Sequence, residues 1–354
     1  MANMDVGTPR FYCDYINFLM SRGEVQNGNF DVYSTGGTQL AVATGSEAEL
    51  FDMRPLNQVT FATTGARQSH VNITLDLRTS ALKIDFVAIL NHNMHPANGK
   101  FRISHADTGA EANIQAVDFG SATAMANVTE AVGVESISNN IVTPDDTDSW
   151  GRGHTIVTFD EIDPNFVGIQ FEGSRNSGDT GAGDYFDDAI NLAIGCILVG
   201  QYYDMPHSPD MTLKRSIAFD AVDVNESLGG QRYSTMTNHG RQVITNSNKS
   251  PFVTYYNDFG AYGGRMSYEL AFSYLNSTDV MPNNYNEPQG ADEAVVEDLW
   301  NRTNGRHIPF IFTQDKTSTD YSDYLFARFG QDSLDMGQVA HKLWNIQMKI
   351  DEEF

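Results

Sequence analysis

The stretch that decides the fold is residues 83–104, KIDFVAILNHNMHPANGKFRIS. Residues 84–90 are apolar at almost every position, which is typical of a central strand that is buried on both faces. A polar corner follows at residues 91–99, where Asn, His, Pro and Gly turn the chain. Phe101 and Ile103 then alternate with polar residues, so the stretch ends in a predicted half-buried strand.

A second apolar stretch, INLAIGCILVG at residues 190–200, also lacks a polar face and ends at a glycine. We expect it to pair with residues 84–90 in the core of one β-sandwich. Shorter alternating segments at residues 71–77, 156–159 and 166–171 supply further strands. Because turn residues separate these strands and no convincing helix occurs among them, the region predicts an antiparallel sandwich or jelly roll.

A second β-rich region begins after Pro206. Its clearest strands are residues 266–274 and 343–350, where apolar and polar residues alternate. Between them, the sequence AVVEDLWNR places apolar residues four positions apart, which predicts one amphipathic helix. We expect Asp292 to cap the start of this helix and Gly305 to end it.

These patterns predict a mainly β protein with two domains. Residues 56–204 are predicted to form an antiparallel β-sandwich (jelly roll), and residues 205–354 a second β-rich α+β domain with one clear helix. Residues 1–55 are predicted to form an N-terminal arm. The aromatic segment RFYCDYINFLMSRG in this arm must pack on an apolar surface, either on the chain's own domains or on a neighbouring molecule.

Charge and composition exclude several classes of protein. The 354 residues include 22 Lys and Arg against 46 Asp and Glu, a net charge of −24. Such a surface repels nucleic acid and anionic membranes, so we expect neither as a partner. Two cysteines make no disulfide framework, and no apolar run is long enough to span a bilayer. We therefore expect a protein made in a cytoplasm, without membrane insertion.

Several passages resemble structural proteins of tailed-bacteriophage virions. FVAILNHNM, KFRIS and the later INLAIGCILVGQYYDMP are similar to the galactose-binding-like (discoidin-like) jelly roll found in distal tail and baseplate ring proteins. MSYELAFSYLNSTD, RHIPFIFTQDK, YLFARF and KLWNIQMKIDEE resemble the C-terminal sheet domain of the same proteins. The resemblance covers residues 8–30, 70–105 and 190–354.

The resemblance implies a non-enzymatic role in the virion. The chain would form a homo-oligomeric ring at the tail tip or baseplate, where it links the tail tube to the adhesion apparatus. Its partners would be further copies of itself and other phage tail proteins. It would be localised in the phage tail after synthesis in the host cytoplasm.

An alternative function is carbohydrate binding during host attachment, because jelly rolls of this kind bind sugars at their loop tips. Trp150, Arg152 and His154 lie together in one predicted loop, and Arg175 and Tyr185 lie in another. Aromatic rings that stack on sugars and polar groups that orient them are the residue types such a site requires. A host surface glycan would then be the partner.

No catalytic motif accompanies these residues, and no cofactor is expected apart from calcium. Asp179, Asp184, Asp187 and Asp188 crowd one glycine-rich loop, and calcium prefers several carboxylate oxygens of this kind. A solvated acidic loop is the alternative.

The corner also contains His92 and His95, which would need a third ligand to bind zinc. A corner in which Asn91 and His92 bond to the backbone is the favoured interpretation. A hydrolase of host surface polymer requires only two suitably spaced carboxylates, but no motif indicates one.

Overall fold

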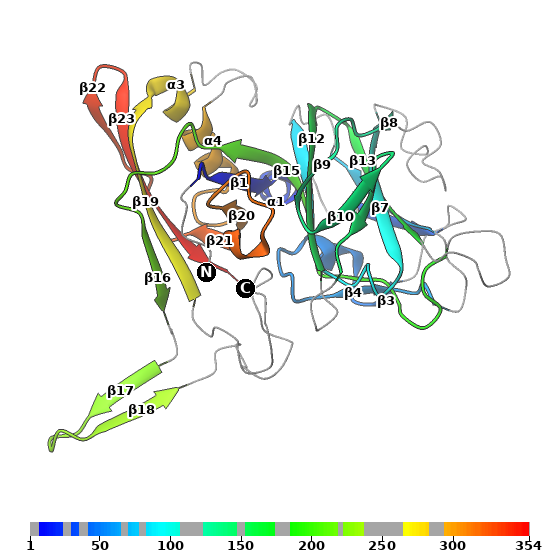
Figure 1. The fold of residues 1–354 in the computed structure, drawn as a ribbon, viewed down its shortest axis with the longest axis horizontal. Helices are drawn as coiled ribbons and strands as arrows, with labels where there is room; N and C mark the ends of the chain where they lie inside the picture. Colours follow the sequence, from blue (N-terminus) through cyan, green and yellow to red (C-terminus); the bar gives the residue numbers. More distant parts are fainter. Residues whose placement is uncertain are drawn as a thin grey trace.

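The computed structural model of the chain is mainly β, with several antiparallel sheets and few helices, as predicted (Figure 1). The residues that it describes are 7–23, 30–34, 42–64, 70–77, 83–106, 123–146, 153–173, 185–218, 222–236, 265–282 and 294–353.

The largest sheet has eleven strands and runs through most of the molecule. Its order is β16 (Lys214–Ala218), β19 (Arg265–Asn276), β23 (Leu343–Glu352), β21 (Tyr324–Phe329), β20 (Phe310–Thr313), β1 (Arg10–Asp14), β15 (Cys196–Asp204), β6 (Ile84–His92), β12 (Gly153–Ile162) and β9 (Thr129–Val132), with β22 (Met336–Ala340) paired to β23.

A second sheet forms the other layer of the sandwich on the right of Figure 1. It contains β10 (Val134–Ser138), β11 (Ile141–Pro144), β7 (Gly99–Ala106), β13 (Phe166–Gly173), β5 (His70–Asp76) and β2 (Phe30–Ser34), with β8 (Thr123–Ala124) paired to β7. A small third sheet contains β14 (Ala193–Ile194), β4 (Val59–Phe61) and β3 (Val42–Thr44).

The central strand of the sandwich is β6, and every one of its residues is buried. It pairs with β15 in an antiparallel register that places Leu198 opposite Ala88, which confirms the predicted partnership. The polar corner then carries the chain from the large sheet to β7 in the second sheet. Asn91 and Asn98 adopt positive φ values of 52° and 53° there, which asparagine tolerates better than most residues.

The aromatic segment near the N-terminus packs on the chain's own strands. β1 lies between β15 and β20, so it joins the sandwich to the C-terminal strands within one sheet. Phe11 stands opposite Tyr203 on one side and Phe312 on the other. Both the strand and the helix that follows are buried in the core, so docking on the same chain is the alternative that the structure confirms.

Two longer helices are described. Helix α1 (Tyr15–Arg22) begins at Asp14, whose carboxylate accepts a hydrogen bond from the Asn17 backbone N–H, and ends at Gly23. It lies in the predicted N-terminal arm, for which no secondary structure was predicted from the sequence. Helix α4 (Val295–Arg302) confirms the predicted helix, and Gly305 follows it at a φ of +65°.

The predicted cap of α4 lies outside the described residues. Asp292 belongs to a segment that the structure does not describe, and the residue at the N-cap position is Ala294, which provides no side-chain bond. Shorter helical turns are η2 (Glu47–Phe51), α3 (Ser277–Val280) and η3 (Tyr321–Asp323). None of the helices in the described part of the chain is long and apolar enough to cross a membrane.

A two-stranded hairpin projects from the body beyond β16. It consists of β17 (Val222–Glu226) and β18 (Arg232–Met236), which pair only with each other among the described strands. Figure 1 shows it extending away from both lobes of the molecule.

Candidate functional site

The residues predicted to bind carbohydrate are only partly described. Trp150, Arg152 and Arg175 lie outside the described residues, so their roles stay predictions. Tyr185 is half-buried at an isolated bridge position beside the sandwich. His154 belongs to β12 rather than to a loop, and it is 8% exposed.

His154 supports the polar corner instead of standing at a loop tip. Its Nδ1 accepts a hydrogen bond of 2.9 Å from the backbone N–H of Asn91. His92 lies beside it with its Nε2 2.9 Å from Thr155 Oγ1, and its Nδ1 accepts from the backbone of Met94. Burial lowers the pKa of His92 well below its usual value, so the ring stays neutral. The favoured interpretation of Asn91 and His92 as a backbone-bonded corner is confirmed.

The predicted metal ligands do not converge within the described residues. Asp187 Oδ1 accepts from the backbone N–H groups of Ala189 and Ile190, which makes it a turn residue. Asp188 is exposed, and Asp179 and Asp184 fall outside the described segments. No group of three or more His, Cys, Asp or Glu side chains in the described part of the chain is arranged to hold a metal ion. Calcium binding stays a prediction.

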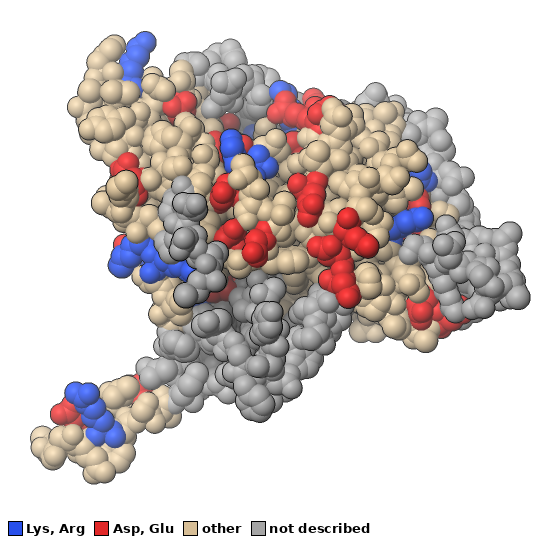
Figure 2. Space-filling view, in the orientation of Figure 1, with Lys and Arg blue, Asp and Glu red and all other residues tan. Residues whose placement is uncertain are grey.

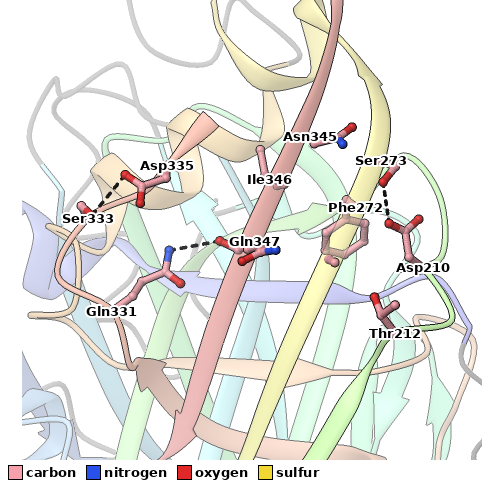
Figure 3. A pocket seen from close by; sticks show the side chains of 11 residues that line it. Asp210, Thr212, Phe272, Ser273, Gln331, Ser333, Asp335, Asn345, Ile346 and Gln347 are labelled. Atoms are coloured by element: carbon pink, nitrogen blue, oxygen red, sulfur yellow. Dashed lines mark hydrogen bonds between the residues drawn. The ribbon is translucent and has the colours of Figure 1, made fainter. Parts of the chain in front are cut away.

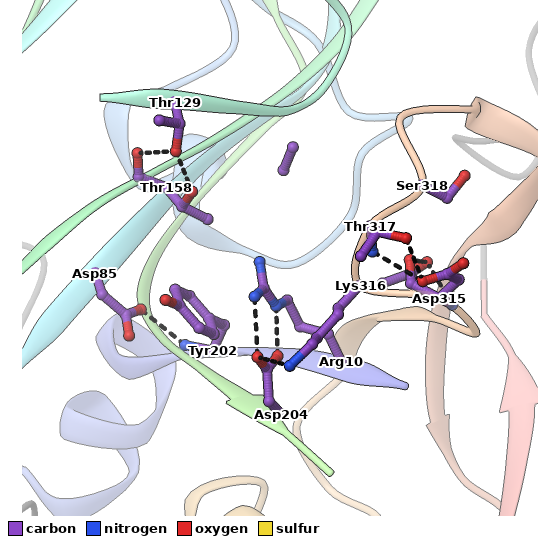
Figure 4. Close-up of polar contacts among 12 residues, drawn as sticks. Arg10, Asp85, Thr129, Thr158, Tyr202, Asp204, Asp315, Lys316, Thr317 and Ser318 are labelled. Atoms are coloured by element: carbon purple, nitrogen blue, oxygen red, sulfur yellow. Dashed lines mark hydrogen bonds and ion pairs between the residues drawn. The ribbon is translucent and has the colours of Figure 1, made fainter. Parts of the chain in front are cut away.

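The seam between the sandwich and the C-terminal strands is fixed by charged pairs (Figure 4). Arg10 Nε lies 2.5 Å from Asp204 Oδ1, and Lys316 Nζ lies 3.2 Å from the other oxygen of the same carboxylate. The Arg10 guanidinium also stacks 4.0 Å from the ring centroid of Tyr202. These contacts join β1, β15 and the loop after β20, so their role is structural.

Two carboxyl groups near this seam titrate at unusually high pH. Burial raises the pKa of Asp85 to about 8, and a hydrogen bond from the Tyr202 N–H offsets part of that shift. Burial likewise raises the pKa of Asp14 to about 6, although it caps α1. Both carboxylates are buried and accept hydrogen bonds from backbone N–H groups, so each supports the local fold.

A groove lies on the outer face of the large sheet, over β19 and β23. The register places Ala271 opposite Gln347, and these two residues form its floor. Figure 3 shows Asp210 and Thr212 on one side of the two strands, and Gln331, Ser333 and Asp335 on the other.

The groove is open, elongated and polar. Its volume is about 500 Å³, and a second hollow of about 330 Å³ shares Thr212, Ala271, Gln331 and Gln347 with it. Its walls are fixed from within: Ser273 Oγ donates a 2.6 Å hydrogen bond to Asp210, and Gln331 Oε1 accepts from the Lys349 N–H. A preformed polar hollow of this kind is suited to binding a ligand by hydrogen bonds.

Tyr274, the residue after Ser273 in the groove lining, has an unusual backbone. Its φ is +64°, and it lies where the pairing of β19 with β23 shifts register. Its ring is 70% exposed. Its N–H donates to Oδ1 of Asn345, which lines the groove. Positive φ is strained for a bulky residue, and such strain gathers at functional sites.

The hairpin presents apolar side chains to solvent. Val224 is 55% exposed, Tyr233 is 57% exposed and Leu228, at the turn, is fully exposed. Figure 2 shows that most of its surface is uncharged, whereas acidic side chains are scattered over the face of the body. The register pairs Val224 with Ser234 and Tyr233 with Asn225, so the two side chains lie on opposite faces of the hairpin.

Comparisons with known proteins assign no family to this chain. No family model matches it, and no curated protein matches it. One similar solved structure is truncated AlyQ with CBM32 and alginate lyase domains, at 12% identity and a TM-score of 0.26. The match covers 82% of this chain and 56% of that chain. A likeness this weak carries no argument about fold or activity.

Proposed function

We propose that the chain is a non-catalytic structural component of a tailed-phage virion that assembles with copies of itself through the β17–β18 hairpin. The sequence resemblance to tail-tip and baseplate ring proteins supports the virion setting. The exposed hairpin is the observation that carries the assembly role. In this proposal the ring links the tail tube to the adhesion apparatus.

The stability of the hairpin depends on what covers it. An isolated two-stranded hairpin is marginally stable in water and needs a third strand or a packed face. Every described side chain of β17 and β18 is exposed, so the described part of the chain provides little of that packing. Because Val224 and Tyr233 lie on opposite faces, a partner would complete the structure by enclosing the hairpin on both faces and covering Leu228 at its turn.

A second copy offers a matching surface. Among the described strands, β16 pairs only with β19, so its other edge presents unpaired backbone groups. Ile217 on β16 is 49% exposed. An arm of one subunit that docks on a different patch of the next is a head-to-tail contact, which closes into a ring when the rotation allows it.

The test is the mass of the intact protein by light scattering at several concentrations, with electron micrographs of the peak. We expect a discrete oligomer that appears as closed rings. Changing Leu228 and Tyr233 together to Asp should give a monomer. The matched control is Ile190→Asp, which alters a 39% exposed residue of the sandwich and should leave the mass unchanged.

A monomer at every concentration, or an oligomer that survives the hairpin substitutions, would contradict the proposal. Repeating the measurement in EDTA tests the acidic loop independently. An oligomer that dissociates in EDTA would assign a bound cation to it.

A further inference from the structure

We infer that the groove over β19 and β23 is a binding site for a neutral oligosaccharide, with Tyr274 as the aromatic surface on which a sugar ring stacks. The site lies in the C-terminal region, apart from the sandwich loops where sugar contacts were predicted. It is independent of the hairpin and of its proposed role in assembly.

The chemistry of the lining matches sugar hydroxyl groups. The Gln347 side-chain amide offers two donors and an acceptor. Gln331 and Asn345 each accept one backbone hydrogen bond, and Gln331 also donates to the Gln347 carbonyl, which leaves each amide a donor and a second acceptor lone pair for a ligand. Asp210 and Asp335 add carboxylate acceptors, which form the stronger hydrogen bonds to hydroxyl donors. A polyhydroxylated ligand can engage such groups along its whole length.

The charge of the lining selects against anionic polymers. Asp210 and Asp335 lie in opposite walls, and no Lys or Arg is among the described residues that line the larger hollow. Lys349, in the smaller hollow, is already paired with Asp351 at 3.4 Å. A uronate or sulfated chain would therefore meet uncompensated negative charge, whereas a neutral sugar would not.

The shape suits a short chain of sugar units. The two hollows follow β19 from Glu269 to Ser273, a length of about 13 Å at the rise of a strand. The groove is open rather than enclosed, so a polymer can enter along its side.

The backbone of Tyr274 is a second feature of the proposed site, separate from the polar lining. Of the non-glycine residues with positive φ in the described segments, six are asparagine and Tyr274 is the only aromatic. The bulge at this position turns its side chain out of the normal alternation of the strand. Asn345 accepts a hydrogen bond from the Tyr274 N–H and also lines the groove. It therefore connects Tyr274 to the proposed binding site.

The experiment uses the intact protein on an array of neutral and uronate-containing oligosaccharides, followed by calorimetric titration with each oligosaccharide bound. Tyr274→Ala removes the proposed stacking ring, and Gln347→Ala removes one amide from the floor of the groove. Gln347 is exposed, so its substitution should not affect folding. Lys342→Gly is the matched control, because Lys342 also has a strained φ of +60° but does not line the groove.

We expect neutral oligosaccharides to bind, with Kd raised by about tenfold or more in Tyr274→Ala and Gln347→Ala and unchanged in Lys342→Gly. An array with no binding, or binding of uronates alone, would overturn the inference. Binding that survives both groove variants but is lost in Trp150→Ala would overturn it as well, because the site would then be in the sandwich loops. The light-scattering mass of each variant separates this result from the proposed assembly.

Discussion

Strand β6 and the β17–β18 hairpin are opposite extremes of the same secondary structure. β6 is apolar on both faces, lies inside an eleven-stranded sheet and has no exposed residue. β17 alternates valine with polar residues, yet its described side chains are exposed. A strand sequence that places its apolar residues on one face is typical of a half-buried strand. The difference is the observation that motivates the proposed partner for the hairpin.

The largest expected effect concerns Asp85, the one acidic residue in β6. Its pKa is raised to about 8 in the folded state from an ordinary value near 4, so its contribution to stability is present below pH 4 and is lost as pH rises through 8. The slope from this group is about 1.4 kcal/mol per pH unit within that window.

Asp85→Asn keeps an acceptor for the Tyr202 N–H and removes the charge. Chemical unfolding at pH 4 and pH 8 should show equal stability at the lower pH and a more stable variant at the higher. Parallel pH profiles for the two proteins would show that Asp85 is not buried in this way.

Truncation of the Phe86 ring in β6 should have the second-largest effect on the free energy of unfolding. Phe86 is fully buried, with its ring 5.1 Å from that of Tyr12. Phe86→Ala should lower the free energy of unfolding by about 3–5 kcal/mol through lost burial and a cavity. Tyr233→Ala in the hairpin is the control, and in dilute monomer it should change stability by less than about 0.5 kcal/mol. A comparable loss in both variants would remove the distinction between the two strands.

A smaller effect is expected at the seam. A Cβ atom on Gly200 of β15 would lie 1.9 Å from the carbonyl oxygen of Cys13 on β1. Gly200→Ala should therefore push the two strands apart and cost about 1–3 kcal/mol. Gly229→Ala in the hairpin turn meets only Ser227 Oγ at 3.9 Å and serves as the control. Denaturant titration compares the two, and an unchanged midpoint for Gly200→Ala would show that the strands separate freely.

The smallest effect is a gain. Tyr274→Gly should stabilise the protein by about 1 kcal/mol, because glycine adopts positive φ without the penalty of a side chain. Thermal unfolding measures the gain, and the same variant should fail to bind oligosaccharide. A loss of stability would show that the Tyr274 ring supports the fold instead of a ligand.

Much of the fold was readable from alternation. β19 and β23 were predicted because burial on one face leaves a period of two, and β6 and β15 because burial on both faces leaves an unbroken apolar run. Helix α1 was missed, although Asp14 before it and Gly23 after it are ordinary capping residues. The density of aromatic residues in that segment resembled a docking arm more than a helix.

The candidate sites were less predictable. His154 was placed in a loop, but β12 begins at Gly153 and is buried on both faces at that end, so the side chain is enclosed. The groove residues Ala271 and Gln347 meet only through the register of β19 with β23. Neither residue carries a local signal, because each is an ordinary outward position of an alternating strand.

The position of β1 has a consequence for the order of events during translation. β1 leaves the ribosome long before either of its neighbours, β15 and β20, has been synthesised. Until then its apolar residues have no sheet to join, and such distant pairings form slowly. A nascent chain that stops after β15 would complete the sandwich but expose one side of β1, an open edge that invites aggregation. We expect the cell to release this protein cleanly only when the last third of the chain has been made.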